Sequence, residues 1–206
     1  MPESSRSRPA RTFRPTAALA RAQAAWIASI EPWRGLGYRA EALGRYLARK
    51  ARAGAVWAAR TSPHGPPLGV VVADDGVLLG AFIALLAVRP EAGGQGVGRR
   101  LVDRVAARTF AKRRWLYTSA DGKNLAALRF YRRLGFARVG RLPDLVSPGR
   151  VEILLRKPAP PEGQSKGKGQ GQGQGQDQRQ RRRRSKQTIT KIPTPAPRVG
   201  YHQGAS

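Results

Sequence analysis

The residues with the clearest chemical potential are four glycines within six positions, in the segment Gly93-Gly94-Gln95-Gly96-Val97-Gly98. Glycine accepts positive φ angles and lets the main chain approach an anion closely. An apolar run typical of a buried strand ends at Val88, and a helix is expected from Arg99. The loop therefore leads into a helix start, where unpaired amides attract negative charge. This arrangement predicts a phosphate-binding loop.

The spacing of the loop excludes two common phosphate-binding motifs. A P-loop requires Lys and then Ser or Thr after its last glycine, whereas this loop is followed by Arg99 and Arg100. A dinucleotide-binding turn requires Gly-x-Gly-x-x-Gly, and from Gly94 or Gly96 the third position is not glycine. The two arginines are expected to add positive charge beside a main-chain cradle.

A second group of residues is spaced for one face of a helix. Asn124, Ala127, Leu128 and Tyr131 stand at i, i+3, i+4 and i+7. The stripe combines a side-chain amide, a small residue and a phenol. A phenol at the end of such a stripe can protonate a leaving thiolate. The same position also suits an aromatic side chain of the core.

The surrounding pattern predicts helices that flank a mixed central sheet, which is an α/β or α+β architecture. Helices are expected over 17–30, 40–51, 99–112 and 124–134, and strands over 55–59, 68–73, 78–88, 114–119, 136–140 and 151–156. A turn is expected at Asp74-Asp75-Gly76. The domain is expected to span 15–157.

The two ends of the chain have compositions that cannot build a core. Residues 158–206 include alternating Gly with Lys or Gln, a run of four arginines and a Pro-rich stretch, and both this tail and residues 1–14 are predicted to be disordered. The tail carries ten Lys/Arg and two Asp/Glu within a chain of net charge +27. Such a tail is expected either to bind nucleic acid through phosphates without sequence preference or to stay solvated without a partner.

Composition removes several kinds of chemistry. The chain has no cysteine and two histidines, which excludes disulfides, thiolate zinc sites and cysteine nucleophiles and leaves no metal site expected. No apolar run approaches the ~20 residues of a membrane-spanning helix. A soluble, cytoplasmic protein is therefore expected.

Taken together, the two motifs closely resemble the GNAT superfamily of N-acetyltransferases. The resemblance covers roughly residues 17–157 and rests, in chain order, on Val88-Arg89-Pro90-Glu91, Gly96-Val97-Gly98-Arg99-Arg100-Leu101, Asn124-x-x-Ala127-x-x-x-Tyr131 and Leu134-Gly135-Phe136. It implies a largely antiparallel sheet that is splayed between the strand before the loop and the strand over 114–119. It also implies that acetyl-CoA, as cosubstrate, inserts into the splay.

The resemblance assigns roles by position. Amides from Gln95 to Arg99 would hold the pyrophosphate, Asn124 would contact the pantetheine or phosphate arm, and Tyr131 would be the general acid. A main-chain amide near Leu86 to Val88 would polarise the thioester carbonyl. The implied cofactor-binding set is Leu86, Ala87, Val88, Gly93, Gly94, Gln95, Gly96, Val97, Gly98, Arg99, Arg100, Asn124, Ala127 and Tyr131.

Two departures from the family's pattern stand out. Gly93 occupies a place where the family usually has Arg or Gln, and the strand over 81–88 has no ionisable residue to serve as general base. A base must then be water or an acid elsewhere, with Glu31, Asp74 and Asp75 as candidates.

The resemblance implies that the acceptor is a primary amine, on a small molecule or a protein N-terminus. This acceptor is expected to contact Glu31, Trp33, Tyr38 and the segment 142–148. The amine is expected to attack the thioester directly, without a covalent intermediate. A domain that binds acetyl-CoA without transferring the acetyl group is the alternative.

Overall fold

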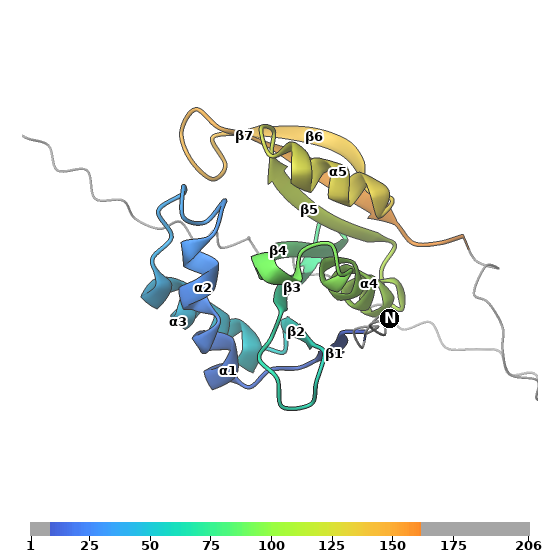
Figure 1. Cartoon of the computed structure of the whole chain (residues 1–206). Helices are drawn as coiled ribbons and strands as arrows, with labels where there is room; N and C mark the ends of the chain where they lie inside the picture. The colour runs from blue at the N-terminus through green and yellow to red at the C-terminus, as the bar shows by residue number, and fades with distance from the viewer. Residues whose placement is uncertain (1–8, 162–206) are drawn as a thin grey trace, which may run out of the picture. The chain divides into compact units, whose positions relative to one another are not determined.

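A sheet of seven strands organises the computed structural model, which describes residues 9–161 (Figure 1). The strands are β1 Arg11–Phe13, β2 Val56–Arg60, β3 Gly69–Val77, β4 Gly80–Val88, β5 Trp115–Asp121, β6 Ala137–Pro143 and β7 Val151–Pro158. Their order is β1-β2-β3-β4-β5-β7-β6, and every neighbouring pair is antiparallel except β4 with β5. The expected mixed, largely antiparallel sheet flanked by helices is confirmed.

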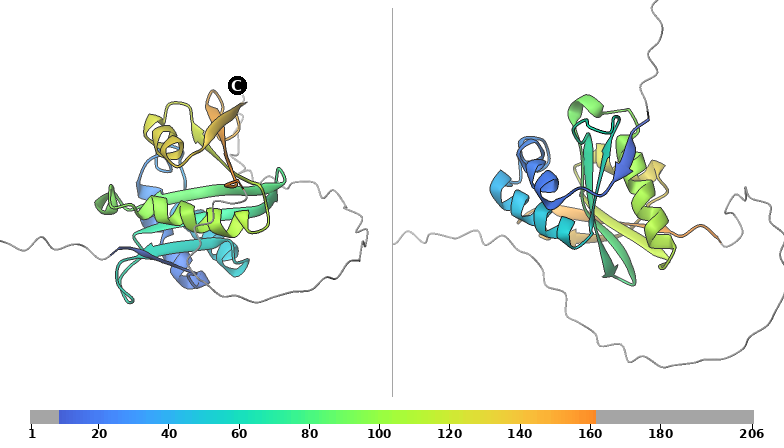
Figure 2. Two further views of the ribbon diagram at one scale, coloured as in Figure 1. Left: turned by 90° about the vertical axis from the view of Figure 1, so that its right-hand side faces the viewer. Right: turned by 90° about the horizontal axis from the view of Figure 1, so that it is seen from below.

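The helices divide the interior into two cores, one on each face of the sheet (Figure 2). The helices are α1 Ala17–Ala22, α2 Ala24–Ser29, α3 Ala40–Arg52, α4 Val97–Phe110 and α5 Leu125–Arg133, with a 3₁₀ turn, η1, over Pro90–Ala92. The first three helices pack on β2, β3 and β4 around Ile27 and Leu47, which we call the α1–α3 core. The last two pack on the other face around Leu101 and Leu128, which we call the α4–α5 core.

One extra residue in β4 changes which side chains of this strand face each core. Val72 of β3 pairs with Leu85, but the next residue, Ala73, pairs with Ile83, so Ala84 is a bulge without a partner. A bulge reverses the alternation of side chains beyond it. Ile83 accordingly packs in the α4–α5 core, whereas Leu85, two residues later, packs in the α1–α3 core.

The bulge coincides with the place where β4 and β5 part. The parallel pairing of the two strands spans three positions and ends at Ile83 with Thr118. Beyond this point β4 runs on to Val88 and β5 runs on to Asp121, with no pairing between them. The splay implied by the sequence resemblance is therefore present, and we call the last pair, Ile83 and Thr118, its vertex.

Two sequence predictions about local structure need correction. The helix expected over 17–30 is two helices, α1 and α2, interrupted at Gln23. The turn expected at 74–76 lies instead at Leu78 and Leu79, which have φ angles of 48° and 62°. The preceding aspartates stay in β3 because each has a cationic partner, Asp74 with Lys50 at 2.6 Å and Asp75 with Arg108 at 2.8 Å.

The boundaries of the folded part also differ from the prediction at both ends. Residues 11–13, expected to be disordered, form the edge strand β1, which pairs with β2. Cations fix this strand in place, since Arg60 lies 4.2 Å from the ring of Phe13 and Arg14 lies 3.8 Å from the ring of Trp57. At the other end, β7 includes Pro158. The predictions for residues 1–8 and 162–206 lie outside the described residues.

The base of the β4–β5 pair allows no side chain at Gly80. A Cβ atom there would lie 2.3 Å from the carbonyl oxygen of Trp115, which is main chain and cannot rotate away. The close approach lets the two strands meet immediately before the pair Ala81 with Leu116. Gly80 is thus required for the short parallel contact from which the splay opens.

We predict that Gly80→Ala destabilises the fold by about 2 kcal/mol or more, because the strands must move apart. Thermal unfolding monitored by circular dichroism would show Tm lowered by roughly 5 °C in a domain of this size. Gly140→Ala in β6 is the matched control, since a Cβ there has ordinary contacts, the nearest at 3.7 Å. Equal Tm values for the two variants would contradict the prediction.

Candidate active site

The open edge of β4 is the first part of the candidate site. Beyond the vertex, Leu85 to Val88 pair with β3 on one side only, and no described strand occupies the other side. Unpaired main-chain groups of a strand are ready to bind an extended ligand in the manner of an added strand. The predicted ligand contacts at Leu86, Ala87 and Val88 therefore lie on an edge that is available.

Beyond this strand, η1 leads into the glycine loop. Gly94 and Gly96 have φ angles of 73° and 75°, and added Cβ atoms would meet nothing within 4 Å. These two glycines are thus required by backbone conformation and not by crowding. Gly93 is different, because a Cβ there would lie 3.0 Å from the carbonyl oxygen of Pro90. This contact gives a local reason why the chain has no side chain at Gly93.

The start of α4 presents three free amides. Arg100 makes the first main-chain hydrogen bond of this helix start, donating to the Gly96 carbonyl at 3.0 Å. Within residues 9–161, the amides of Val97, Gly98 and Arg99 have no main-chain acceptor. The Gln95 amide, by contrast, donates to the Ala92 carbonyl at 3.4 Å. Of the amides predicted to hold a phosphate, from Gln95 to Arg99, the free ones are therefore those of the last three residues.

Positive charge surrounds this cradle. Arg100 is exposed, and Arg99 is 70% exposed with a single distant partner, Asp103, at 3.5 Å. A solvated pair of this length holds a side chain weakly. Both guanidinium groups are thus free to approach an anion bound at the helix start, where the helix dipole also favours negative charge.

Gly98 joins the loop to α5. A Cβ on Gly98 would lie 3.3 Å from Cζ of Phe130 and 3.4 Å from Cγ2 of Val88. The glycine therefore lets α4, α5 and β4 converge at one point.

Asn124 begins α5 as its N-cap. Its Oδ1 accepts a hydrogen bond from the amide of Ala127 at 3.0 Å, which satisfies one donor of the first turn. The side-chain nitrogen of Asn124 is not used in this cap. The predicted stripe is thus half structural, since Leu128 and Tyr131 are both buried in the α4–α5 core.

The Tyr131 side chain combines a core ring with a hydroxyl at the vertex of the splay. The residue is 6% exposed, and its ring makes edge-to-face contacts with Phe130 and Phe136 at 5.1 and 5.3 Å. Burial raises the pKa of Tyr131 to about 12, and hydrogen bonding to the Thr118 side chain acts in the opposite direction. Thr118 Oγ1 also donates to the Ile83 carbonyl at 3.1 Å, so this hydroxyl marks the end of the β4–β5 pairing.

Comparison with known proteins identifies the family. Residues 52–138 match the model of the acetyltransferase (GNAT) domain, a stretch that includes the open edge, the loop, Asn124 and Tyr131. Residues 52–138 thus belong to a GNAT acetyltransferase domain. A search of curated proteins found no match.

Solved structures share the fold of this GNAT domain. A GNAT-family protein from Desulfovibrio desulfuricans is 19% identical, with a TM-score of 0.59 over 73% of this chain and 99% of that chain. Ard1 from Thermoplasma volcanium is also 19% identical, with a TM-score of 0.59 over 73% of this chain and 97% of that one. A chain of the NatC complex bound to Gag peptide and CoA is 20% identical, with a TM-score of 0.55 over 73% and 98%.

Of the three residues predicted to contact the acceptor, one remains near the splay with an available polar group. Glu31 is occupied within its own loop, accepting hydrogen bonds from Arg34 Nε at 3.0 Å and the Gly35 amide at 3.1 Å. Trp33 packs against the α1–α3 core. Tyr38 is 42% exposed, and the pKa of its phenol is raised by burial and by the charge of Glu152.

Two of the three predicted general bases are engaged by other groups. Asp74 and Asp75 pair with Phe82 and Ala81, before the vertex, where β4 still pairs with β5. Both carboxylates form salt bridges, with Lys50 and Arg108, so neither is free to accept a proton from the amine.

A carboxylate that sequence reasoning missed lies near the splay. Glu152 is 8% exposed and lies in β7 opposite Asp121, the last residue of β5. The pKa of Glu152 is raised, mainly by burial and further by the charge of Asp121. Hydrogen bonding from the Ser119 side chain and the charge of Arg150 act in the opposite direction. One feature of the sequence points to it, because Glu152 is the single ionisable residue in the otherwise apolar run Val151–Leu155.

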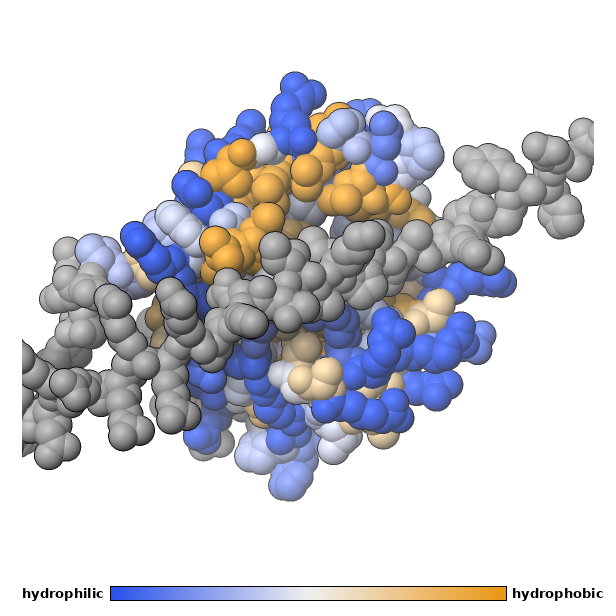
Figure 3. Space-filling model, turned by 180° about the vertical axis from the view of Figure 1, so that it is seen from behind, coloured by the Kyte–Doolittle hydropathy of each residue, from blue (hydrophilic) through white to orange (hydrophobic). Residues whose placement is uncertain are grey.

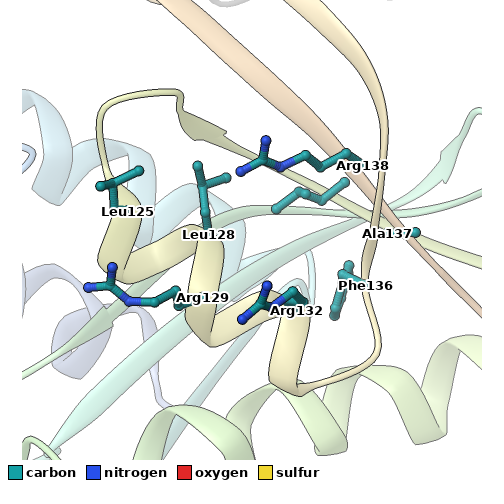
Figure 4. Close-up of a pocket in the computed structure, with 8 residues that line it drawn as sticks. Leu125, Leu128, Arg129, Arg132, Phe136, Ala137 and Arg138 are labelled. Atoms are coloured by element: carbon teal, nitrogen blue, oxygen red, sulfur yellow. The ribbon is translucent and has the colours of Figure 1, made fainter.

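A cavity between α5 and β6 is separate from this site (Figure 4). Its floor is apolar and its rim includes three arginines, with Leu125, Leu128, Arg129, Arg132, Phe136, Ala137, Arg138 and Leu155 as the lining. Neither the glycine loop nor Tyr131 is among the lining residues. Within the part of the chain that the structure describes, no cluster of metal-binding side chains and no helix able to cross a membrane is found.

Proposed function

We propose that this GNAT domain transfers an acetyl group from acetyl-CoA to a primary amine. The observation that carries the proposal is the alignment of three features along one path: the amides at the start of α4, the open edge of β4 and the Tyr131 hydroxyl at the vertex. A phosphate, an extended arm and a thioester follow one another in acetyl-CoA in the same order. The NatC chain with the same fold was crystallised with CoA.

The cofactor is held mainly by main-chain groups in this proposal. Its pyrophosphate accepts hydrogen bonds from the amides of Val97 to Arg99, with charge supplied by Arg99 and Arg100. The pantetheine arm pairs with the free edge of β4 over residues 85–88, as an added strand does. The unused side-chain nitrogen of Asn124 contacts the same arm. These contacts explain how a loop with glycine at position 93 can still bind a diphosphate.

The chemistry is a direct transfer between sulfur and nitrogen. The nitrogen lone pair of the amine attacks the thioester carbon, while a main-chain amide between Leu86 and Val88 stabilises the negative charge on the carbonyl oxygen. The C–N bond forms, the C–S bond breaks, and Tyr131 gives its proton to the sulfur. A phenol with pKa of about 12 is fully protonated near neutral pH and so carries the proton required.

We predict that Tyr131→Phe lowers kcat by ~100-fold, the usual weight of a general acid. The assay is thiol release from acetyl-CoA with a panel of polyamines, amino acids, aminoglycosides and N-terminal peptides. The ring packing remains in the variant, and Thr118 still donates to Ile83, so Tm should stay near that of the parent. Tyr46→Phe in α3, a half-buried tyrosine of the other core, is the control and should keep full activity. An unchanged kcat in Tyr131→Phe would remove this residue from the mechanism.

A second prediction concerns the loop. Gly96→Ala and Gly54→Ala place a side chain at φ angles of 75° and 65°, in both cases in open space. Each variant should lose about 1 kcal/mol of stability through the same backbone strain. Only Gly96→Ala alters the amide cradle, so only this variant should raise KM for acetyl-CoA, by roughly tenfold for each 1.4 kcal/mol of lost binding. If KM for acetyl-CoA were the same in the two variants, the pyrophosphate would bind away from this loop.

The same assays separate transfer from simple binding. Acetyl-CoA should raise Tm by an amount that grows with the logarithm of its concentration above Kd, whether or not transfer occurs. A rise in Tm without thiol release across the whole amine panel would show that the domain binds acetyl-CoA as a ligand only. Thiol release with a defined amine identifies the acceptor class.

A further inference from the structure

The two faces of β5 and β7 have different surroundings. Ile153 and Leu155 of β7 lie in the α4–α5 core, as does Ala120 of β5. Side chains alternate along a strand, and directly opposite residues of an antiparallel pair share a face. Glu152 and its partner Asp121 therefore project from the other face, together with Ser119. Tyr131 approaches the vertex from α5, so it reaches the splay from the opposite side of the sheet to Glu152.

The α1–α3 core does not extend over this second face of β5 and β7. The first three helices make that core with β2, β3 and β4, and no residue of β5 or β7 belongs to it. Seen from behind, hydrophobic side chains gather in the upper half of the molecule, which holds β5, β6 and β7 (Figure 3). The loop between α2 and α3 approaches this face, because Glu152 is close enough to affect the pKa of Tyr38.

Glu152 is more than nine-tenths buried, yet no cation in residues 9–161 forms a salt bridge with it. The nearby guanidinium of Arg150 is engaged by Asp121, at 3.4 Å. The Ser119 side chain is a hydrogen-bonding neighbour of the carboxylate, and the β6 residue opposite Glu152 is the apolar Leu142. Burying a carboxylate without a cation is costly. A positively charged ligand would relieve that cost.

The register places this carboxylate on the open arm of the splay. Asp121 lies three residues beyond Thr118, so the pair Asp121 and Glu152 is about 10 Å past the vertex along β5. An acceptor that enters beside Tyr38 meets Glu152 before it reaches the thioester. We propose that Glu152 is the general base of this domain, binding the ammonium form of the acceptor and removing its proton.

This role for Glu152 rests on the acetyl transfer proposed above, and each proton of the reaction has a donor and an acceptor. The ammonium group gives one proton to Glu152, which later releases it to water. The resulting lone pair attacks the thioester carbon, the C–N bond forms and the C–S bond breaks. The sulfur takes its proton from Tyr131, and the second proton lost by the nitrogen returns to Tyr131 through solvent. The net products are an amide, free CoA and one proton in solution.

The test is Glu152→Gln, which keeps shape and removes the base. We expect kcat/KM for the amine to fall ~100-fold or more at pH 7, while the rise in Tm caused by acetyl-CoA is unchanged. In the parent, kcat/KM should fall at acid pH as Glu152 becomes protonated, at a pH above the usual range for Glu because burial and Asp121 raise its pKa. That acid limb should be absent from the variant. Glu41→Gln, on the exposed surface of α3, is the control.

The Tm of Glu152→Gln distinguishes a catalytic role of Glu152 from a merely structural one, because loss of a structural contact would lower Tm. A carboxyl whose pKa is raised in the folded state stabilises the fold below its unfolded pKa, and this contribution is lost as pH rises through the folded pKa. At a pH above the folded pKa the ionised Glu152 is therefore a cost, and there Glu152→Gln should have Tm equal to or above that of the parent. A lower Tm with lost activity would indicate a structural role and overturn the proposal.

The remaining outcomes keep this inference separate from the proposed function. A parent protein that releases no thiol with any amine would contradict acetyl transfer itself. A parent that is active, with an acid limb that persists in Glu152→Gln, would leave acetyl transfer intact and show that another group is the base.

Discussion

The parting of β4 and β5 is the constraint on which the remaining structure depends. Two parallel strands that start in contact would normally pair along their whole length, and here they pair at three positions only. The extra residue Ala84 moves the odd-numbered side chains of β4 from the α4–α5 core to the α1–α3 core, while β5 continues in register with β7. The result is a gap inside a continuous sheet, with main-chain groups exposed along one side. A ligand can be held there without any dedicated side chain.

Charge is distributed unevenly around this gap. The chain carries a net charge of +27, and the start of α4 adds helix amides and arginines to that field. An anionic ligand is favoured at this end over long range. Glu152 and Asp121 lie at the other arm of the splay, in one of the few places where negative side chains gather. In the proposed function, phosphates bind beside α4 and the cationic acceptor binds on the arm of β5, so this charge distribution would give a bound molecule its direction.

The sequence allowed the loop, the α5 stripe and the family's fold to be predicted, because each is encoded in local spacing. Four glycines before a helix and Asn124 seven residues before Tyr131 are patterns that neighbouring residues alone define. The bulge was invisible, since Ala84 stands in an apolar run that looks continuous. The turn was misplaced because Asp74 and Asp75 resemble turn residues until their partners on α3 and α4 are known. Glu152 was missed for the same reason, as its neighbours come from β5 and from the loop before α3.

The contact between Gly98 and Phe130 sets a distance as well as a packing arrangement. It brings the first turn of α4 against the helix that carries Tyr131, so the spacing between the cradle and the phenol depends on this packing. The two ends of a cofactor bound between them would be held at a fixed separation. The domain would then measure the length of the arm that joins phosphate to thioester, and it would reject carriers whose arm is shorter or longer, although every atom that reacts is the same.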